Sequence, residues 1–377
     1  MDSLAAYLPQ DRRQALAHGL LLPDRTDGTA LFADISGFTP LTEALRLALG
    51  PRQGSEALTD HLNRTYTALM TQVDAYRGSV IGFAGDAITC WFDAADGPAA
   101  PRAAACAVAL QRTMAAGARI TLPSGGVTML ALKVALASGP ARRMVVGDPA
   151  IQTLDLLAGA TLTRVAEAEH HAGAGEIVLD AASVAALGAT ATTGAWREDA
   201  ETGEHFAPLL ELLVAPSPAP WPALAADALP PALLQPWLLP AVYARELGGY
   251  GTFLTELRPA VALFLRFVGI DYDADPDAPT RLDTFICTAQ RSLARDAGTL
   301  LQVIIGDKGS YLCCAFGAPV AHEDDTYRAV LAALALHQER GTRARPLPAG
   351  SDWTEPRGYA LRGVWGHESA HLRDFGR

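Results

Sequence analysis

The predicted order of strands and helices repeats on the two sides of a proline-rich stretch, and this repeat limits the chain to few folds. Before the stretch, the sequence predicts a strand, two helices, a hairpin, a third helix and two further strands (31–35, 40–49, 56–76, 77–93, 101–118, 130–139 and 175–180). After it, the sequence predicts a strand, a helix, a hairpin and a helix (260–271, 281–298, 300–317 and 322–340). Each half is therefore expected to be an α+β sandwich, with helices on one face of an antiparallel sheet.

The proline-rich stretch covers residues 214–240 and predicts a domain boundary, because proline removes backbone donors and favours extended geometry. We expect a division of the chain into four parts. These are an N-terminal helical lead (1–24), a first domain (25–213), a linker (214–245) and a second, incomplete domain (246–377).

The composition excludes several classes of protein. Half of the 377 residues are apolar and 19% are charged, which is typical of a folded globular protein. The net charge of −11 argues against a general nucleic-acid binder. The sequence also predicts no membrane span and no signal peptide. Its five cysteines lie in apolar runs without metal-binding spacing, which favours buried thiols and a cytoplasmic location (Cys90, Cys106, Cys287, Cys313 and Cys314).

Two aspartates stand where a strand or hairpin meets a turn. Asp34 ends the apolar run Leu31-Phe32-Ala33 and precedes a glycine-containing turn, and Asp86 lies in the predicted hairpin turn. If the hairpin pairs with the first strand, both carboxylates lie at one end of the sheet, and such a pair favours Mg²⁺ or Mn²⁺ between them. The alternative is that Asp34 is an N-cap and Asp86 an ordinary turn residue.

The stretches "FADISGFTPLTEAL" and "GSVIGFAGDAITCWF" resemble the catalytic domain of class III nucleotidyl (adenylate/guanylate) cyclases. The tandem arrangement, with "GTFLTELRPAVALFLRF" and "IIGDKGSYLCCAFGAP" in the second half, is similar to soluble adenylyl cyclase and its bacterial relatives. The resemblance covers about residues 25–330. It implies two ferredoxin-like (βαββαβ) cyclase domains in a pseudo-two-fold pair, each domain contributing to active sites at their interface.

The resemblance also implies roles for particular residues. Asp34 and Asp86 would ligate two Mg²⁺ or Mn²⁺ ions, helped by the backbone carbonyl of Ile35. The backbone of Gly37, Phe38 and Thr39 would bind the triphosphate of ATP. These are the substrate-binding residues expected of the first half.

The second half is expected to bind the base and not the metals. Arg266 and Ser310 stand at the positions that match Asp34 and Asp86. Lys308, in "GDKGS", matches the family's adenine-reading lysine, and Asp374 aligns with the second adenine-reading residue. Guanylyl cyclases have an acid at the position of Lys308, so a lysine there favours ATP as substrate.

The sequence departs from the family at two places. Gly82 stands where soluble adenylyl cyclases carry the lysine tied to bicarbonate sensing. The C-terminal stretch "RGYALRGVWGHESAHLRDFGR" matches the family poorly and offers no residues at the positions of its transition-state asparagine and arginine, so the chain looks truncated or divergent there. Arg164 lies in the corresponding segment of the first half and is interpreted as a surface helix residue.

The predicted function is that of an adenylate cyclase, a phosphorus–oxygen lyase that converts ATP to 3′,5′-cyclic AMP and pyrophosphate in intracellular signalling. The alternative is a catalytically weak or inactive nucleotide-binding or regulatory module. The sequence leaves open a homodimer or a regulatory partner.

Overall fold

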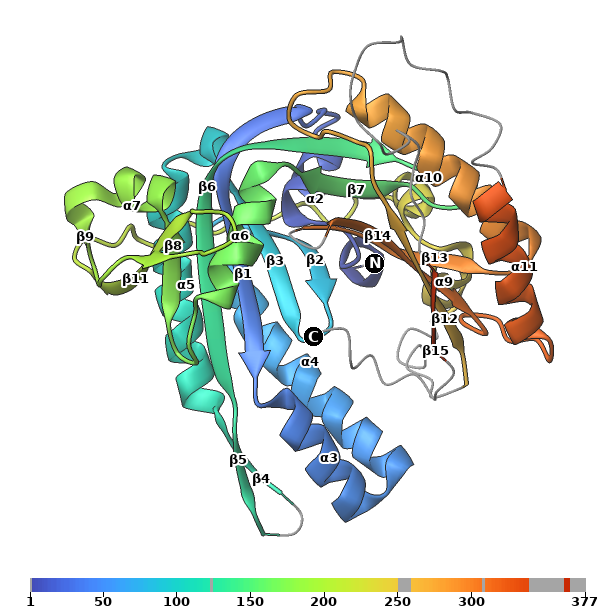
Figure 1. Cartoon of the computed structure of the whole chain (residues 1–377), viewed down its shortest axis with the longest axis horizontal. Coiled ribbons are helices and arrows are strands. Elements are labelled where there is room, and N and C mark those ends of the chain that lie inside the picture. The colour runs from blue at the N-terminus through green and yellow to red at the C-terminus, as the bar shows by residue number, and fades with distance from the viewer. Residues whose placement is uncertain (1, 123–124, 250–258, 307–308, 339–362, 367–377) are drawn as a thin grey trace. The chain divides into compact units, whose positions relative to one another are not determined.

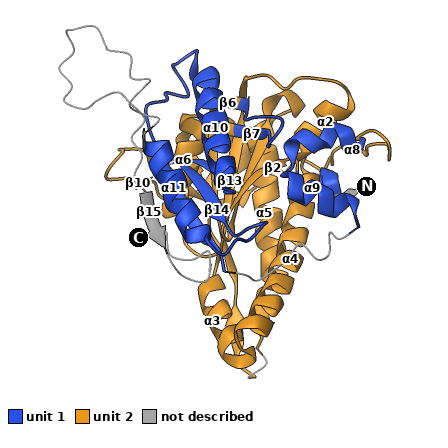
Figure 2. Ribbon diagram, turned by 90° about the vertical axis from the view of Figure 1, so that its right-hand side faces the viewer, with its two compact units in different colours: residues 1–7, 144–156, 230–377 blue, residues 8–143, 157–229 orange. Residues whose placement is uncertain are grey.

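The computed structural model describes residues 2–122, 125–249, 259–306, 309–338 and 363–366. By their contacts these residues form two compact units, drawn in different colours in Figure 2. The N-terminal unit comprises residues 8–143 and 157–229, and the C-terminal unit comprises residues 1–7, 144–156 and 230–377. The predicted division into domains 25–213 and 246–377, and their pairing about a pseudo-two-fold axis, stay predictions.

Most elements before residue 213 belong to the N-terminal unit. In chain order they are α2 (Gln10–Ala17), β1 (Arg25–Ser36), α3 (Phe38–Leu49), α4 (Pro51–Ala75), β2 (Ser79–Ala84), β3 (Ala87–Asp93), the 3-10 helix η1 (Ala94–Asp96), α5 (Ala99–Gly117), β4 (Arg119–Thr121), β5 (Val127–Met129), β6 (Ala131–Val146), β7 (Leu154–Ala158), α6 (Ala160–His170), β8 (Ile177–Asp180), α7 (Ala181–Leu187), the 3-10 helix η2 (Gly188–Thr190), β9 (Ala191–Thr193), β10 (Arg197–Glu198) and β11 (His205–Leu212). The main strands pair in the order β10-β11-β8-β6-β1-β3-β2, with β7 added on β6 and β9 on β11.

The large sheet carries helices on both faces, whereas the sequence predicted them on one. Leu31 and Ile35 of β1 lie in a core with α3, α4 and α5. Ala30 lies in a second core with residues of α6 such as Val165. The sheet is also mixed, because β6 and β8 pair in parallel. The predicted strand at 175–180 corresponds to β8, whereas α6 and the elements from α7 to β11 extend the predicted unit.

The break between α3 and α4 is shorter than the sequence predicted. The segment "PRQGS" was expected to interrupt the helices, but only Gly50, at φ +81°, separates them. Pro51 occupies the first turn of α4, where its missing N–H costs no helical hydrogen bond. A Cβ on Gly54 would lie 2.9 Å from the Cα of Arg46, so glycine permits the close approach of the two helices. Both helices run on past the end of β1 (Figure 1).

The C-terminal unit contains a smaller sheet with the same strand order. Its elements are α1 (Asp2–Ala5), α8 (Pro231–Leu234), the 3-10 helix η3 (Gln235–Trp237), α9 (Pro240–Leu247), β12 (Val261–Phe267), α10 (Ala278–Arg295), β13 (Thr299–Gly306), β14 (Gly309–Phe316), α11 (Asp325–Gln338) and β15 (Gly363–Gly366). The succession β12-α10-β13-β14-α11-β15 is βαββαβ, with sheet order β13-β14-β12-β15. The counterpart in the N-terminal unit is β2-β3-β1-β6.

The repeat extends to single residues. In each unit a helix precedes the hairpin, α4 in one and α10 in the other, and the same kind of turn follows that helix. Arg77 and Ala297 both have φ +58° although neither is glycine. Each is followed by a glycine, and a Cβ added to that glycine would clash with a phenylalanine ring. A Cβ on Gly78 would lie 2.6 Å from a ring carbon of Phe92. The matching distance for Gly298 is 2.4 Å from Phe316. The predicted internal repeat is therefore present in the structure of the two units.

The proline-rich stretch begins as an extended segment on the N-terminal unit. The backbone N–H of Ala219 donates to the Ala75 carbonyl at 2.8 Å, and the Trp221 indole donates to the Gly78 carbonyl at 2.9 Å. Gln14 of α2 donates to the carbonyl of Pro222 at 2.7 Å. Residues 219–222 are thus fixed by hydrogen bonds rather than free. No helix among the described residues is both long and apolar enough to cross a membrane.

Candidate active site

Strand β1 delivers Asp34 to the α6 face of the sheet. Because side chains alternate along a strand, Ala33 and Ile35 enter the core under α3–α5 and Asp34 points to the other side. The side chain of Asp34 is half-buried at this strand end, and its backbone pairs with Ala87 of β3. The apolar pattern of β1 therefore determines where this carboxylate emerges.

Asp86 reaches the same end of the sheet through the β2–β3 turn. Ala84 pairs with Ala87, and Gly85 between them adopts φ +64°. The backbone N–H of Ile35 donates to the Asp86 carbonyl at 3.2 Å, so the turn is joined directly to the residue after Asp34. The predicted meeting of Asp34 and Asp86 at one sheet end is thus present.

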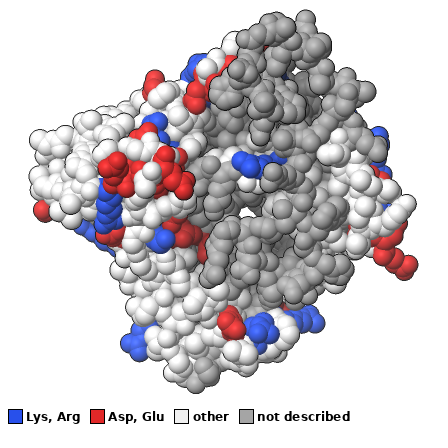
Figure 3. All heavy atoms as spheres, viewed as in Figure 1, with Lys and Arg blue, Asp and Glu red and all other residues white. Residues whose placement is uncertain are grey.

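The electrostatics of Asp34 reflect this crowding of acids. Burial, and then the charges of Asp86 and Glu169, raise the pKa of Asp34 to about 6, whereas Lys133 lowers it. Two carboxylates that oppose each other's ionisation are stabilised by a cation between them. Acidic side chains also gather over α6 on the face drawn in Figure 3.

Lys133 is a site residue that the sequence prediction missed. It lies on β6 at the position paired with Asp34, and its Nζ is 3.1 Å from Oε1 of Glu169 on α6. The ammonium group is therefore held beside the two aspartates by a neighbouring carboxylate. A usable signal was in the composition: of the 30 lysine and arginine residues, only Lys133 and Lys308 are lysine.

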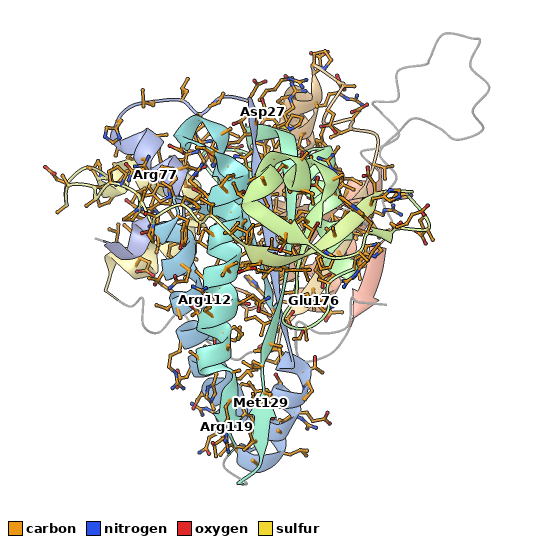
Figure 4. All side chains as sticks on the ribbon, turned by 90° about the vertical axis from the view of Figure 1, so that its left-hand side faces the viewer. Asp27, Arg77, Arg112, Arg119, Met129 and Glu176 are labelled. Atoms are coloured by element: carbon orange, nitrogen blue, oxygen red, sulfur yellow. The ribbon has the colours of Figure 1, made fainter. Side chains whose placement is uncertain are left out.

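The turn after β1 leads straight into α3. Gly37 has φ +92°, and a Cβ there would lie 2.7 Å from the Met129 carbonyl, so this position requires glycine. Met129 lies on β5, opposite Arg119 of β4, in the hairpin that Figure 4 labels. Phe38 and Thr39 form the first turn of α3, where backbone N–H groups have no helical acceptor. The side chain of Ile35 is buried in the core, and its carbonyl stays a predicted ligand.

The donor set at this end of the sheet fits a hard divalent cation. Asp34 and Asp86 offer carboxylate oxygens, and among the described residues no group of three or more His, Cys, Asp or Glu could form a closed metal cage. Mg²⁺ is commonly bound by one or two carboxylates, with waters and substrate phosphates completing its coordination. The residues present therefore fit a metal held jointly by protein and nucleotide.

The C-terminal unit carries different residues at the matching positions. In the N-terminal unit Asp34 pairs with Ala87, the residue after Asp86, and in the C-terminal unit Arg266 pairs with Tyr311, the residue after Ser310. The strand register thus supports the predicted match. The Ser310 hydroxyl lies 2.8 Å from the Tyr272 hydroxyl. Lys308 and Asp374 lie outside the described residues.

The structure corrects the interpretation of Arg164. It was expected on a solvated helix surface, but its Nε donates to Oδ2 of the buried Asp180 at 3.1 Å. Its Nη2 also donates to the Ser138 carbonyl at 2.9 Å, so Arg164 joins α6 to β6 and β8.

Gly82 replaces the lysine that the resemblance ties to bicarbonate sensing. In the structure it lies at an irregularity in the β2–β3 pairing.

Comparison with known proteins now identifies the N-terminal part of the chain. Residues 24–201 match the family model described as the adenylate and guanylate cyclase catalytic domain. This part of the chain is a cyclase catalytic domain. It is similar to adenylate cyclase type 10 from Rattus norvegicus and from Homo sapiens, each 36% identical over 90 residues. That match covers 22% of this chain, and the chain spans only 5% of the length of these relatives.

Solved structures of cyclase domains are also similar. The guanylate cyclase domain of RhGC from Catenaria anguillulae, in complex with GTP, is 18% identical with a TM-score of 0.42, covering 50% of this chain and 98% of that one. The adenylyl cyclase CyaB from P. aeruginosa is 21% identical with a TM-score of 0.40, covering 51% and 97%. Both adenylyl and guanylyl cyclases thus stand among the structures similar to the cyclase domain.

Metal binding by the cyclase domain is expected to weaken below pH 6. Because the pKa of Asp34 is raised to about 6 without metal, protons compete for its carboxylate below that pH. Apparent Mn²⁺ affinity should rise by about tenfold per pH unit up to pH 6 and then level off. The stability of the metal-free protein depends on pH in the opposite direction. The pKa of Asp34 is higher in the folded state, about 6, than its usual value of 3.8, so the free energy of unfolding falls as pH rises between these two values.

Calorimetric Mn²⁺ titrations between pH 5 and pH 8 would measure this dependence. Asp34→Asn serves as the control, since its remaining Mn²⁺ affinity should lose the steep dependence on pH. An affinity of the wild-type protein that stays constant from pH 5 to pH 7 would contradict the prediction.

Proposed function

We propose that the chain is an adenylate cyclase that converts ATP to 3′,5′-cyclic AMP and pyrophosphate. The observation that carries the proposal is the convergence of Asp34 and Asp86 at one end of the sheet, with Lys133 beside them. Class III cyclases generally use two divalent metal ions. Asp34 and Asp86, with the Ile35 carbonyl, are the residues that would hold them, and Mg²⁺ or Mn²⁺ suits these oxygen ligands.

The reaction joins the ribose 3′-oxygen to the α-phosphorus and releases pyrophosphate. When bound, the metal ions lower the pKa of the 3′-hydroxyl and stabilise negative charge on the phosphates. The backbone N–H groups of Gly37, Phe38 and Thr39 would orient the triphosphate at the start of α3. Lys133 would add a fixed positive charge where negative charge accumulates on the leaving group.

ATP is proposed over GTP because of Lys308. A lysine at this position favours adenine recognition, and the resemblance to cyclases gives Asp374 as a second base-reading residue. We further propose a cytoplasmic location, supported by the five cysteines, all of which are free thiols.

The alternative proposal is a nucleotide-binding module with little or no turnover. It is supported by the C-terminal stretch, which lacks the asparagine and arginine that the family uses in the transition state. Removing a group that meets developing charge on a phosphoryl oxygen can cost about a hundredfold or more in rate. The two proposals agree on the metal site and differ on turnover.

The test is a product assay on the full chain. Purified protein is incubated with ATP or with GTP, each with Mg²⁺ or Mn²⁺, and cyclic nucleotide and pyrophosphate are measured by chromatography. We expect cyclic AMP and pyrophosphate in equal amounts from ATP and much less cyclic GMP from GTP. Metal-dependent ATP binding without product would favour the alternative, and a preference for GTP would contradict the assignment of Lys308.

A further inference from the structure

The β2–β3 turn is fastened to α4 by one tyrosine. The hydroxyl of Tyr66 donates to the carbonyl of Gly85 at 3.2 Å, one residue before Asp86. The Tyr66 ring is half-buried and meets the ring of Phe83 edge-on, with centroids 5.5 Å apart. The same side chain thus contacts β2 through its ring and the turn through its oxygen.

The contact reaches the turn at a residue with no side chain of its own to pack. A Cβ on Gly85 would meet nothing within 4 Å, so the space beside this residue is open. On its other side, the turn is joined to β1 by the hydrogen bond from Ile35 to the Asp86 carbonyl. The backbone that carries Asp86 is therefore joined to α4 by one hydrogen bond and to β1 by another, in addition to the β2–β3 pairing.

Tyr66 also lies in the field of both acids. Burial, and then the charges of Asp86 and Asp34, raise the pKa of its hydroxyl well above the usual value. The hydroxyl therefore keeps its proton at neutral pH and remains a donor to the Gly85 carbonyl. It is a neutral group that can sit beside two carboxylates without repelling them.

We infer that Tyr66 is a positioning residue that holds the Gly85–Asp86 turn in the geometry required for metal binding. The inference rests on the proposed function, since it assigns Tyr66 to the metal site of that reaction. Tyr66 acts through Asp86 and need not touch metal or nucleotide itself. Without the hydrogen bond, the turn would sample positions in which Asp86 and Asp34 no longer face one ion together.

The variant Tyr66→Phe tests this inference, because it keeps the ring against Phe83 and removes only the hydroxyl. We expect Mn²⁺, titrated alone and followed by electron paramagnetic resonance, to bind about three- to tenfold more weakly, the effect of losing one net hydrogen bond. Amide exchange at Ile35, whose N–H bonds to Asp86, should become faster in the metal-free protein. The thermal unfolding midpoint should change little.

Tyr76→Phe is the matched control, because Tyr76 ends the same helix and packs against the core away from the turn. It should leave Mn²⁺ affinity and Ile35 exchange as in the wild type. Tyr66→Phe with wild-type Mn²⁺ affinity and wild-type Ile35 exchange would overturn the inference while leaving the metal site intact. Absence of Mn²⁺ binding by the wild-type chain would instead overturn the proposed function, and with it the role of Tyr66 in metal binding.

Discussion

The Asp86→Asn variant is expected to lose cyclic nucleotide production by at least about a hundredfold while keeping its fold. The amide retains the size and turn geometry of Asp86 but not the charge that holds a divalent ion. Its metal-free form should be as stable as the wild type or slightly more so, because the change removes an acid whose charge raises the pKa of Asp34. Loss of activity without loss of stability is the signature of a metal ligand.

Cyclic AMP production and thermal unfolding, measured on the same preparations, test this expectation. Asp27→Asn is the matched control, because Asp27 is an exposed acid near the opposite end of the same strand β1 (Figure 4). Asp34→Asn should resemble Asp86→Asn, and combining the two changes should add little, since both remove the same site. Asp86→Asn with more than a tenth of wild-type activity would contradict the metal role.

The repeat of strands and helices was predictable from the sequence because its signals are strong and local. The apolar runs in β1 and β3, and the Gly85-Asp86 turn between β2 and β3, each occur within a few residues. The start of α4 was predicted five residues late, because proline and glycine were read as a break. In the structure Pro51 is in the first turn of α4, and Gly54 packs so close to α3 that a Cβ there would lie 2.9 Å from the Cα of Arg46.

The candidate site was predicted in part. The juxtaposition of Asp34 and Asp86 follows from strand pairing, which the hairpin pattern already indicated. Lys133 and Tyr66 could not be placed in the same way, because their proximity depends on β6 pairing with β1 and on the packing of α4. Arg164 was misjudged for the same reason: its partner Asp180 is near in space only once β6 and β8 are side by side.

The Asp11→Ala variant is expected to lower the free energy of unfolding of the N-terminal unit by about 3–5 kcal/mol. Asp11 of α2 forms an ion pair with Arg143 of β6, and the two side chains are only 8% and 4% exposed. Removing Asp11 leaves the buried Arg143 charge without the carboxylate that balances it, which costs more than the lost attraction alone. The backbone N–H of Asp11 also donates to Oγ of Ser79 at 2.9 Å, so the first helix of the unit is joined to two strands.

Urea denaturation followed by tryptophan fluorescence would measure this loss, since Trp91 and Trp221 both lie in the N-terminal unit. Glu56→Ala is the control, because it breaks an ion pair with Arg52 whose side chains are 87% and 65% exposed, and should cost at most about 0.5 kcal/mol. An Asp11→Ala variant as stable as Glu56→Ala would refute the expectation.

Replacing both partners, Asp11→Leu with Arg143→Met, should recover most of the stability lost by Asp11→Ala, because the buried Arg143 charge is then removed together with its carboxylate. This result would bear on every activity test of the chain. Residues 1–24 were predicted as an N-terminal helical lead, and α2 within this segment is held by a buried ion pair to the strand that also carries Lys133. A shortened chain that begins at residue 25 would lose Asp11 and its ion pair with β6. Inactivity of that chain would therefore not distinguish a destabilised fold from the loss of a working site at Asp34 and Asp86.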